Sequence, residues 1–334
     1  MRFAAGSWSI VLLTFGGALH AWSEAPPAKQ PIRYGLIGPV GPQGKSIPSP
    51  KGKGRWDITQ AGTYENYLID LEFADTDAVR IRADNTILRN CELRNGSRDA
   101  IEVYADDVLI EGCRIRHFLA GSFTDQKDAH GITGQSRRLT VRNCEISYCS
   151  GDAWQMDPGR KPWGEVVIEN CEIFTGPLPQ DAGKFKKGQQ PGENGIDTKV
   201  DPKSPRSKLT IRNSVFHGYR DAGYIANTAA LNLKENVDVL IENCVFYDNN
   251  IAMRLRGPGS RGGAHVTVKD CYYYNCAVAF RIEDGIEQLR IIRPHFGAGV
   301  QRRYQEVSGK AVGLKVEAEE DAPPIEQLLG PKNP

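Results

Sequence analysis

The segment Glu-Asn-Gly-Ile-Asp-Thr-Lys, residues 193–199, concentrates side chains that are suited to acid and base chemistry. We interpret Lys199 as a Brønsted base, since a neutral amine can accept a proton from a substrate. Glu193 and Asp197 belong to the same segment, and Asp157 ends a similar segment earlier in the chain. Asp157, Asp197 and Glu193 are predicted to bring oxygen ligands together, as a hard cation such as Ca²⁺ requires.

This combination suits the removal of a proton that lies beside a carboxylate. β-Elimination from a uronic acid sugar needs a base for that proton and positive charge to neutralise the carboxylate. Arg254 and Arg256 are predicted to bind substrate carboxylates with their guanidinium forks. The predicted partner is therefore an anionic polysaccharide, and the predicted substrate-binding residues are Lys234, Arg254, Arg256, Asn232 and Gln155.

Repeated short segments must position these side chains. DAVRIRA at residue 77, DAIEVYA at 99 and IAMRLRG at 251 belong to a set of eight, and a second type such as VIENCEI follows almost every one. Both types alternate apolar and polar residues, which predicts short strands, and the shortest interval of 22 residues suits one solenoid coil. Such coils bury their apolar residues by stacking, about 4.8 Å apart. The sequence therefore predicts an all-β parallel solenoid with eight recognisable coils.

Alternation along the first strand of each coil assigns side chains to two faces. The third and fifth positions are predicted to point inward, and the second, fourth and sixth outward. The outward second position is always small, which predicts a flat floor for a polymer, and it consists of Ala78, Ala100, Ala129, Ala153, Gly195, Ala230, Ala252 and Ala279. A basic strip on three consecutive coils consists of Lys199, Lys234, Arg254 and Arg256. An evenly solvated sheet face is the alternative, but long insertions around the segment at 194 are predicted to wall a groove.

Two more columns follow the second strand. An Asn, Gly or Asp at the corner between strands is predicted to take a positive φ. The cysteines that come next are predicted to stack as buried free thiols, although a secreted protein also allows disulfides. Parallel side chains have a poor geometry for such bonds, and the column consists of Cys91, Cys113, Cys144, Cys171, Cys244 and Cys271.

Some further polar and aromatic residues have weaker signals. His130 occupies an inward position by parity and is predicted to pack in the core. Trp163 and Phe185 lie in inserted loops, where each is a candidate for stacking on a sugar ring. A ladder that caps the strand entrances is predicted to consist of Asp77, Asp99, Asp128 and Asp152.

Residues 55–299 resemble the pectate-lyase-like right-handed parallel β-helix superfamily, beginning with GRWDITQAGTYENYLID. The resemblance implies a single-stranded right-handed parallel β-helix. Residues 193–199 also resemble the lysine-bearing strand of calcium-dependent pectate lyases, notably the family 9 polysaccharide lyases. That resemblance implies a lysine base at Lys199 and, more loosely, roles for Glu193, Asn194 and Asp197.

Other functions occur on the same scaffold and stay open. A glycoside hydrolase would need paired carboxylates, but the adjacent Asp-Asp pair, the Gly-His-Gly segment and the Arg-x-Lys segment of polygalacturonases are missing. A C5-epimerase shares the proton abstraction, but its Asp-Pro-His motif is also missing. A glycan-binding or adhesin-type solenoid without activity is the third alternative.

Composition and the chain ends complete the predictions. A formal net charge of +1 over 334 residues excludes an argument for nucleic-acid binding from bulk charge. Residues 1–23 are interpreted as a signal peptide, so we expect a secreted or periplasmic monomer without a membrane span in the mature chain. The predicted organisation then continues with a Pro/Gly-rich linker at 24–54, the β-helix domain at 55–300 and a tail at 301–334.

Overall fold

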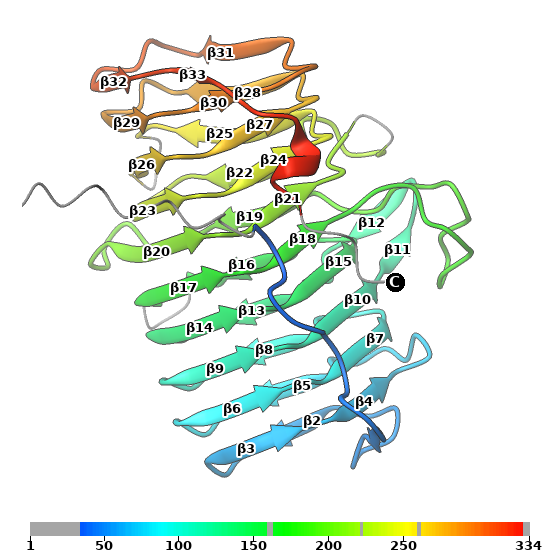
Figure 1. Cartoon of the computed structure of the whole chain (residues 1–334). Coiled ribbons are helices and arrows are strands. Elements are labelled where there is room, and N and C mark those ends of the chain that lie inside the picture. Colours follow the sequence, from blue (N-terminus) through cyan, green and yellow to red (C-terminus); the bar gives the residue numbers. More distant parts are fainter. Residues whose placement is uncertain (1–33, 159–162, 221–222, 259–261, 330–334) are drawn as a thin grey trace, which may run out of the picture. The chain divides into compact units, whose positions relative to one another are not determined.

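The computed structural model describes residues 34–158, 163–220, 223–258 and 262–329. They form a right-handed parallel β-helix, as predicted, in which the chain visits three parallel sheets in turn (Figure 1). Sheet 1 carries the first strand of each coil and consists of β2 (Trp56–Ile58), β5 (Val79–Ile81), β8 (Ile101–Val103), β13 (Ile132–Gly134), β16 (Trp154–Met156), β19 (Asn194–Thr198), β22 (Ala229–Leu233), β25 (Ile251–Arg256), β28 (Val278–Glu283) and β31 (Arg302–Val307).

The other two sheets follow in each coil. Sheet 2 consists of β3 (Gly62–Glu65), β6 (Thr86–Arg89), β9 (Val108–Glu111), β14 (Arg138–Arg142), β17 (Glu165–Glu169), β20 (Ser207–Arg212), β23 (Val237–Glu242), β26 (His265–Lys269), β29 (Gln288–Ile292) and β32 (Leu314–Glu317). Sheet 3 consists of β1 (Ile47–Pro48), β4 (Tyr67–Asp70), β7 (Glu92–Gly96), β10 (Arg114–Phe118), β15 (Glu145–Cys149), β18 (Glu172–Phe174), β21 (Val215–His217), β24 (Val245–Tyr247), β27 (Tyr272–Tyr274), β30 (His295–Phe296) and β33 (Glu320–Asp321). The hairpin β11 (Ala120–Ser122) and β12 (Asp125–Lys127) and a short 3₁₀ helix, η1 (Ile325–Gln327), lie outside these sheets.

The core consists of like residues stacked on like in successive coils. In sheet 1, Trp154 pairs with Ile196, which pairs with Leu231, and all three side chains are fully buried. Aromatic rings stack in the same way in sheet 3, where Phe216 lies 5.1 Å from Phe246 between ring centroids. Because each coil covers the apolar face of the next, burial depends on the stack rather than on any single coil.

The corner and cysteine columns are arranged as predicted. The corner residues Asn90, Asn143, Asn170, Asn213, Asn243 and Asp270 take φ values between 49° and 53°. All eight cysteines are buried free thiols. Ser214 occupies the cysteine column in its coil, and its hydroxyl accepts a hydrogen bond from the Cys171 amide over 3.1 Å.

The small second column is not a floor for a polymer, contrary to the prediction. Its alanines at 78, 100, 230, 252 and 279 are completely buried, because the chain turns into the strand at this position and the methyl groups pack in the core. One coil also has a different register. Thr133, not Gly131, pairs with Glu102 and Gln155, since the β11–β12 hairpin takes up additional residues before the strand.

Both predicted domain boundaries differ from the structure. Residues 34–48 of the predicted linker run along the corners of several coils, where Gly41 donates to the Gly112 carbonyl and Ile37 to the Asn143 side chain. The first part of the predicted tail forms another coil with β31, β32 and β33. These segments satisfy backbone groups that the stack leaves unpaired. The predicted signal peptide lies outside the described residues, and within the described ones no helix is long and apolar enough to cross a bilayer.

Candidate active site

The predicted site residues lie on the outward side of sheet 1. The strand register places Gln155, Asp197, Asn232 and Arg254 side by side on β16, β19, β22 and β25. This column follows from the alternation in the sequence. The long connections on either side of β19, to β18 and to β20, emerge at the two edges of the sheet, as predicted for loops that flank a binding face.

Asp197 forms an ion pair with the lysine of the next coil. Its Oδ2 atom lies 3.0 Å from Lys234 Nζ, and only 2% of the residue is exposed. Burial raises the pKa of the Asp197 carboxyl, and the Lys234 charge offsets only part of that effect. Asp197 Oδ1 is buried without a hydrogen-bond partner, as are Gln155 Oε1 and Asn232 Oδ1. The centre of this face thus holds acceptor atoms that the described residues do not satisfy.

Lys199 is half-buried directly after β19, where its main chain is held from two sides. The Trp163 indole donates a hydrogen bond to the Lys199 carbonyl oxygen over 2.8 Å, and the next amide, that of Val200, donates to Glu235 Oε2 over 2.6 Å. Within the described ranges, no carboxylate oxygen lies within 4.0 Å of the Lys199 amine. The lysine therefore has a fixed backbone and an amine that is free of ion pairs.

The two loop aromatics do not stack on a ligand. Trp163 is 1% exposed and packs edge-to-face on Trp154, with 5.5 Å between ring centroids. Phe185 is completely buried in a small loop core with Leu119 and Leu178. Their predicted sugar-stacking role is wrong, because inserted loops of this length build apolar cores of their own.

The three predicted calcium ligands are only partly brought together. Glu193 and Asp197 lie close enough for burial and the Asp197 charge to raise the pKa of Glu193. Asp157 is instead surrounded by His130, Asp99 and Lys199, and burial is the main cause of its raised pKa. Among the described residues, Asp157, Asp197 and Glu193 do not form a group whose ligand oxygens all lie within 4.8 Å of one another. As placed, these residues do not fit a calcium ion.

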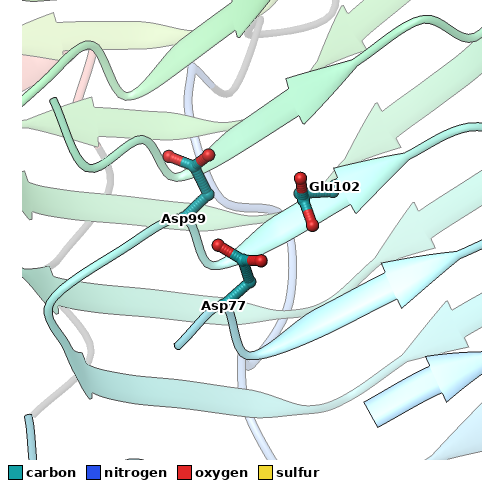
Figure 2. A group of neighbouring side chains, drawn as sticks. All are labelled: Asp77, Asp99 and Glu102. Atoms are coloured by element: carbon teal, nitrogen blue, oxygen red, sulfur yellow. The ribbon is translucent and has the colours of Figure 1, made fainter. Parts of the chain in front are cut away.

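A different set of carboxylates does meet that distance. Asp77 and Asp99 precede β5 and β8, and Glu102 lies on β8, so that their oxygens converge (Figure 2). Burial, followed by the Asp77 charge, raises the pKa of Glu102 to about 7. Arg80 already occupies this group, with Nε 2.6 Å from Glu102 Oε2 and Nη2 3.2 Å from Asp77 Oδ2. A guanidinium thus supplies the positive charge here.

A polar ladder across four coils was only partly foreseen in the sequence. His130 Nδ1 lies 3.0 Å from Asp99 Oδ1, its Nε2 lies 3.9 Å from Asp152 Oδ2, and Asp152 Oδ1 accepts from Asn194 Nδ2 over 2.9 Å. Burial opposes the protonation of His130, but the Asp99 hydrogen bond outweighs it and raises the His130 pKa. Burial raises the pKa of Asp152 strongly, and the charges of Asp197 and Glu193 add to it. His130 is buried as predicted, but among carboxylates, and it takes the ladder position assigned to Asp128.

The predicted carboxylate-binding arginines share one acidic partner. Arg254 forms two hydrogen bonds with Glu283, each 3.1 Å long, and Arg256 Nε lies 3.2 Å from the same carboxylate. Arg281, in the column of Arg254, reaches Glu283 as well, over 2.7 Å. Alternation identified the two predicted arginines, whereas their common partner depends on how side chains cross from coil to coil.

Comparison with known proteins agrees with this architecture. The family model described as "Right handed beta helix region" matches residues 61–176 and 130–296. A solved structure, the alginate lyase from Paenibacillus sp. str. FPU-7, is similar with a TM-score of 0.45 and 14% identity, over 85% of this chain and 91% of that one. We draw no conclusion from a likeness of that level. A search of curated proteins finds no match.

Proposed function

The chain belongs to the right-handed β-helix family, and from this premise we propose that it is a secreted or periplasmic polysaccharide lyase acting on an anionic, uronate-containing polymer such as pectate. The observation that carries the proposal is the environment of Lys199. Its amine has no carboxylate within 4.0 Å among the described residues, and three cationic side chains continue from it on the next two coils: Lys234, Arg254 and Arg256.

The proposed reaction is a β-elimination with Lys199 as the base. Its neutral amine accepts the proton on the carbon beside the uronate carboxylate, and the electrons of that C–H bond form the new double bond. The bond to the glycosidic oxygen breaks at the neighbouring carbon, and that oxygen leaves with a proton from solvent. Cationic side chains neutralise the substrate carboxylate and thereby stabilise the negative charge that develops.

Ion pairing distinguishes the two lysines of this face. A base must lose its own proton first, which a neighbouring carboxylate opposes. Lys234 is paired with Asp197 over 3.0 Å, whereas Lys199 has no such partner among the described residues. Lys199 is therefore the better base, and Lys234 the better fixed cation. No step of the proposed reaction passes through calcium, since the three predicted ligands do not form a site.

Replacement of Lys199 tests the proposal. The variant K199A should lower turnover of pectate, alginate or a glycosaminoglycan by at least about 100-fold, measured from the ultraviolet absorbance of the unsaturated product. K208A is the matched control, because Lys208 lies exposed on sheet 2 and should be dispensable. Full activity of K199A would rule out the assignment. A wild-type protein that binds these polymers without product would instead support the glycan-binding alternative.

A further inference from the structure

Three arginines converge on a single buried glutamate at one end of the candidate site. We name Arg254, Arg256, Arg281 and Glu283 the arginine cluster. The first two arginines lie on β25, and Arg281 and Glu283 lie on the neighbouring strand β28. Guanidinium nitrogens of all three lie between 2.7 and 3.2 Å from Glu283 oxygens. Only 6% of the Glu283 side chain is exposed, so the carboxylate is the inner anchor of the cluster.

The cluster holds more positive charge than its own acids neutralise. Arg254 alone satisfies both oxygens of Glu283. Asp284 adds one more carboxylate, 3.4 Å from Arg256, and Asn227 accepts from Arg281 without neutralising it. Three guanidinium groups thus face two carboxylates, which leaves one positive charge in surplus. The arginine side chains are 19%, 33% and 21% exposed, so a ligand can reach their outer nitrogens.

We propose that the arginine cluster is a subsite for a second carboxylate of the polymer, away from the sugar that Lys199 attacks. Planar guanidinium groups bind carboxylates in pairs of hydrogen bonds, and a surplus positive charge attracts them. Glu283 is a positioning residue, which fixes the directions of the three arginines before the substrate arrives. The identity of the anion as a uronate rests on the proposed function.

The register sets the length of substrate that this subsite needs. Arg254 lies two coils from Asp197 in the same column, and Arg281 lies three coils from it. At about 4.8 Å per coil, these steps correspond to roughly 10 and 14 Å along the stack. A disaccharide at Lys199 is too short to fill the cluster, whereas a tetrasaccharide can reach it. The cluster therefore favours chains of several uronates over short ones.

Binding to proteins that cannot turn over tests the subsite. In a K199A background, calorimetry would measure the affinity for tetrasaccharides and disaccharides of pectate and of alginate. R281M should weaken tetrasaccharide binding about tenfold or more, the typical value of a charge-assisted hydrogen bond, and leave disaccharide binding unchanged. R290M is the matched control, because Arg290 is exposed on sheet 2 and should not affect either ligand.

Glu283→Gln separates positioning from simple charge. The variant adds one positive charge, so bulk attraction alone predicts tighter binding of the tetrasaccharide. A positioning role predicts weaker binding, because the arginines lose their anchor. Tighter binding in E283Q, or an unchanged affinity in R281M, would overturn the proposal. If E283Q does not fold, as judged by circular dichroism, R281M decides alone. A protein that binds through the cluster but forms no unsaturated product would refute the lyase function and leave this subsite intact.

Discussion

Trp163 donates its indole N–H to the carbonyl oxygen of Lys199 over 2.8 Å. The two residues are brought together across the corner between sheets 1 and 2. The Trp163 carbonyl in turn accepts a hydrogen bond from Ser207 Oγ, and the ring packs on Trp154 beneath β16. The main chain of the proposed base is therefore held by a buried aromatic residue, and the loop that carries this residue affects the site without contacting substrate.

Replacement of Trp163 should affect turnover more than binding. W163F keeps most of the apolar surface but removes the N–H donor, which leaves the Lys199 carbonyl unsatisfied at a cost of about 1–3 kcal/mol in the free energy of unfolding. A small displacement of Lys199 should lower kcat by about ten- to a hundredfold, with little change in KM. W56F is the control, since Trp56 packs on Tyr64 and Tyr67 at the far end of the stack. Equal losses of kcat in both variants would indicate only a structural role.

The Asp197–Lys234 pair should contribute strongly to stability when only one partner is removed. K234M leaves a carboxylate that is 2% exposed without its counter-charge, and we expect a loss of about 3–5 kcal/mol in the free energy of unfolding. The double variant D197L/K234M should recover much of that loss. Urea unfolding measures both. The exposed pair of Lys208 and Glu165 is the control, for which K208M should cost at most about 1 kcal/mol. Additive losses at Asp197 and Lys234 would contradict the coupling.

The His130 ladder predicts that stability depends on pH. The pKa of His130 is raised in the folded protein by Asp99, Asp152 and Asp128 against the effect of burial, so its stabilising contribution is complete below about pH 6.5 and is lost as pH rises through the folded pKa. The pKa of Asp99 is lowered, mainly because the His130 hydrogen bond outweighs burial, so its contribution is lost only as the solution becomes strongly acidic. Both contributions are present near pH 5.5.

Urea unfolding at pH 5.5 and pH 9 checks this dependence. The difference in unfolding free energy between the wild type and H130Q should be larger at pH 5.5 than at pH 9. T133V, at a buried neutral residue two positions after Gly131, should have the same effect at both values. A difference for H130Q that does not change with pH would show that the ladder does not hold a charged imidazole.

Removal of divalent cations should leave turnover unchanged. The described residues place Lys234, and not a group of carboxylates, beside Asp197, and arginines supply the positive charge nearby. Activity after dialysis against EDTA, with and without added Ca²⁺, measures this directly. Loss of activity that calcium restores would instead support the calcium site predicted from the sequence, and would require the three predicted ligands to rearrange.

The sequence alone determined the coil repeat, the three-sheet stack and the outward column through Gln155, Asp197, Asn232 and Arg254. These features depend on the parity of a strand and on the spacing of corners, which are local properties of a few consecutive residues. The same local rule was wrong at Asp128, because the β11–β12 hairpin changes the register before the strand begins. The free cysteine column followed from stacking geometry, which repeats in every coil.

Only the tertiary structure decided which side chains contact one another between coils. It paired Asp197 with Lys234, placed His130 between Asp99 and Asp152, and gathered three arginines on Glu283. It also buried Trp163 against Lys199 instead of exposing it to a ligand. The physical reason is that partners 22 to 44 residues apart meet through rotamers and loop packing, which a one-dimensional alternation of apolar and polar residues does not encode.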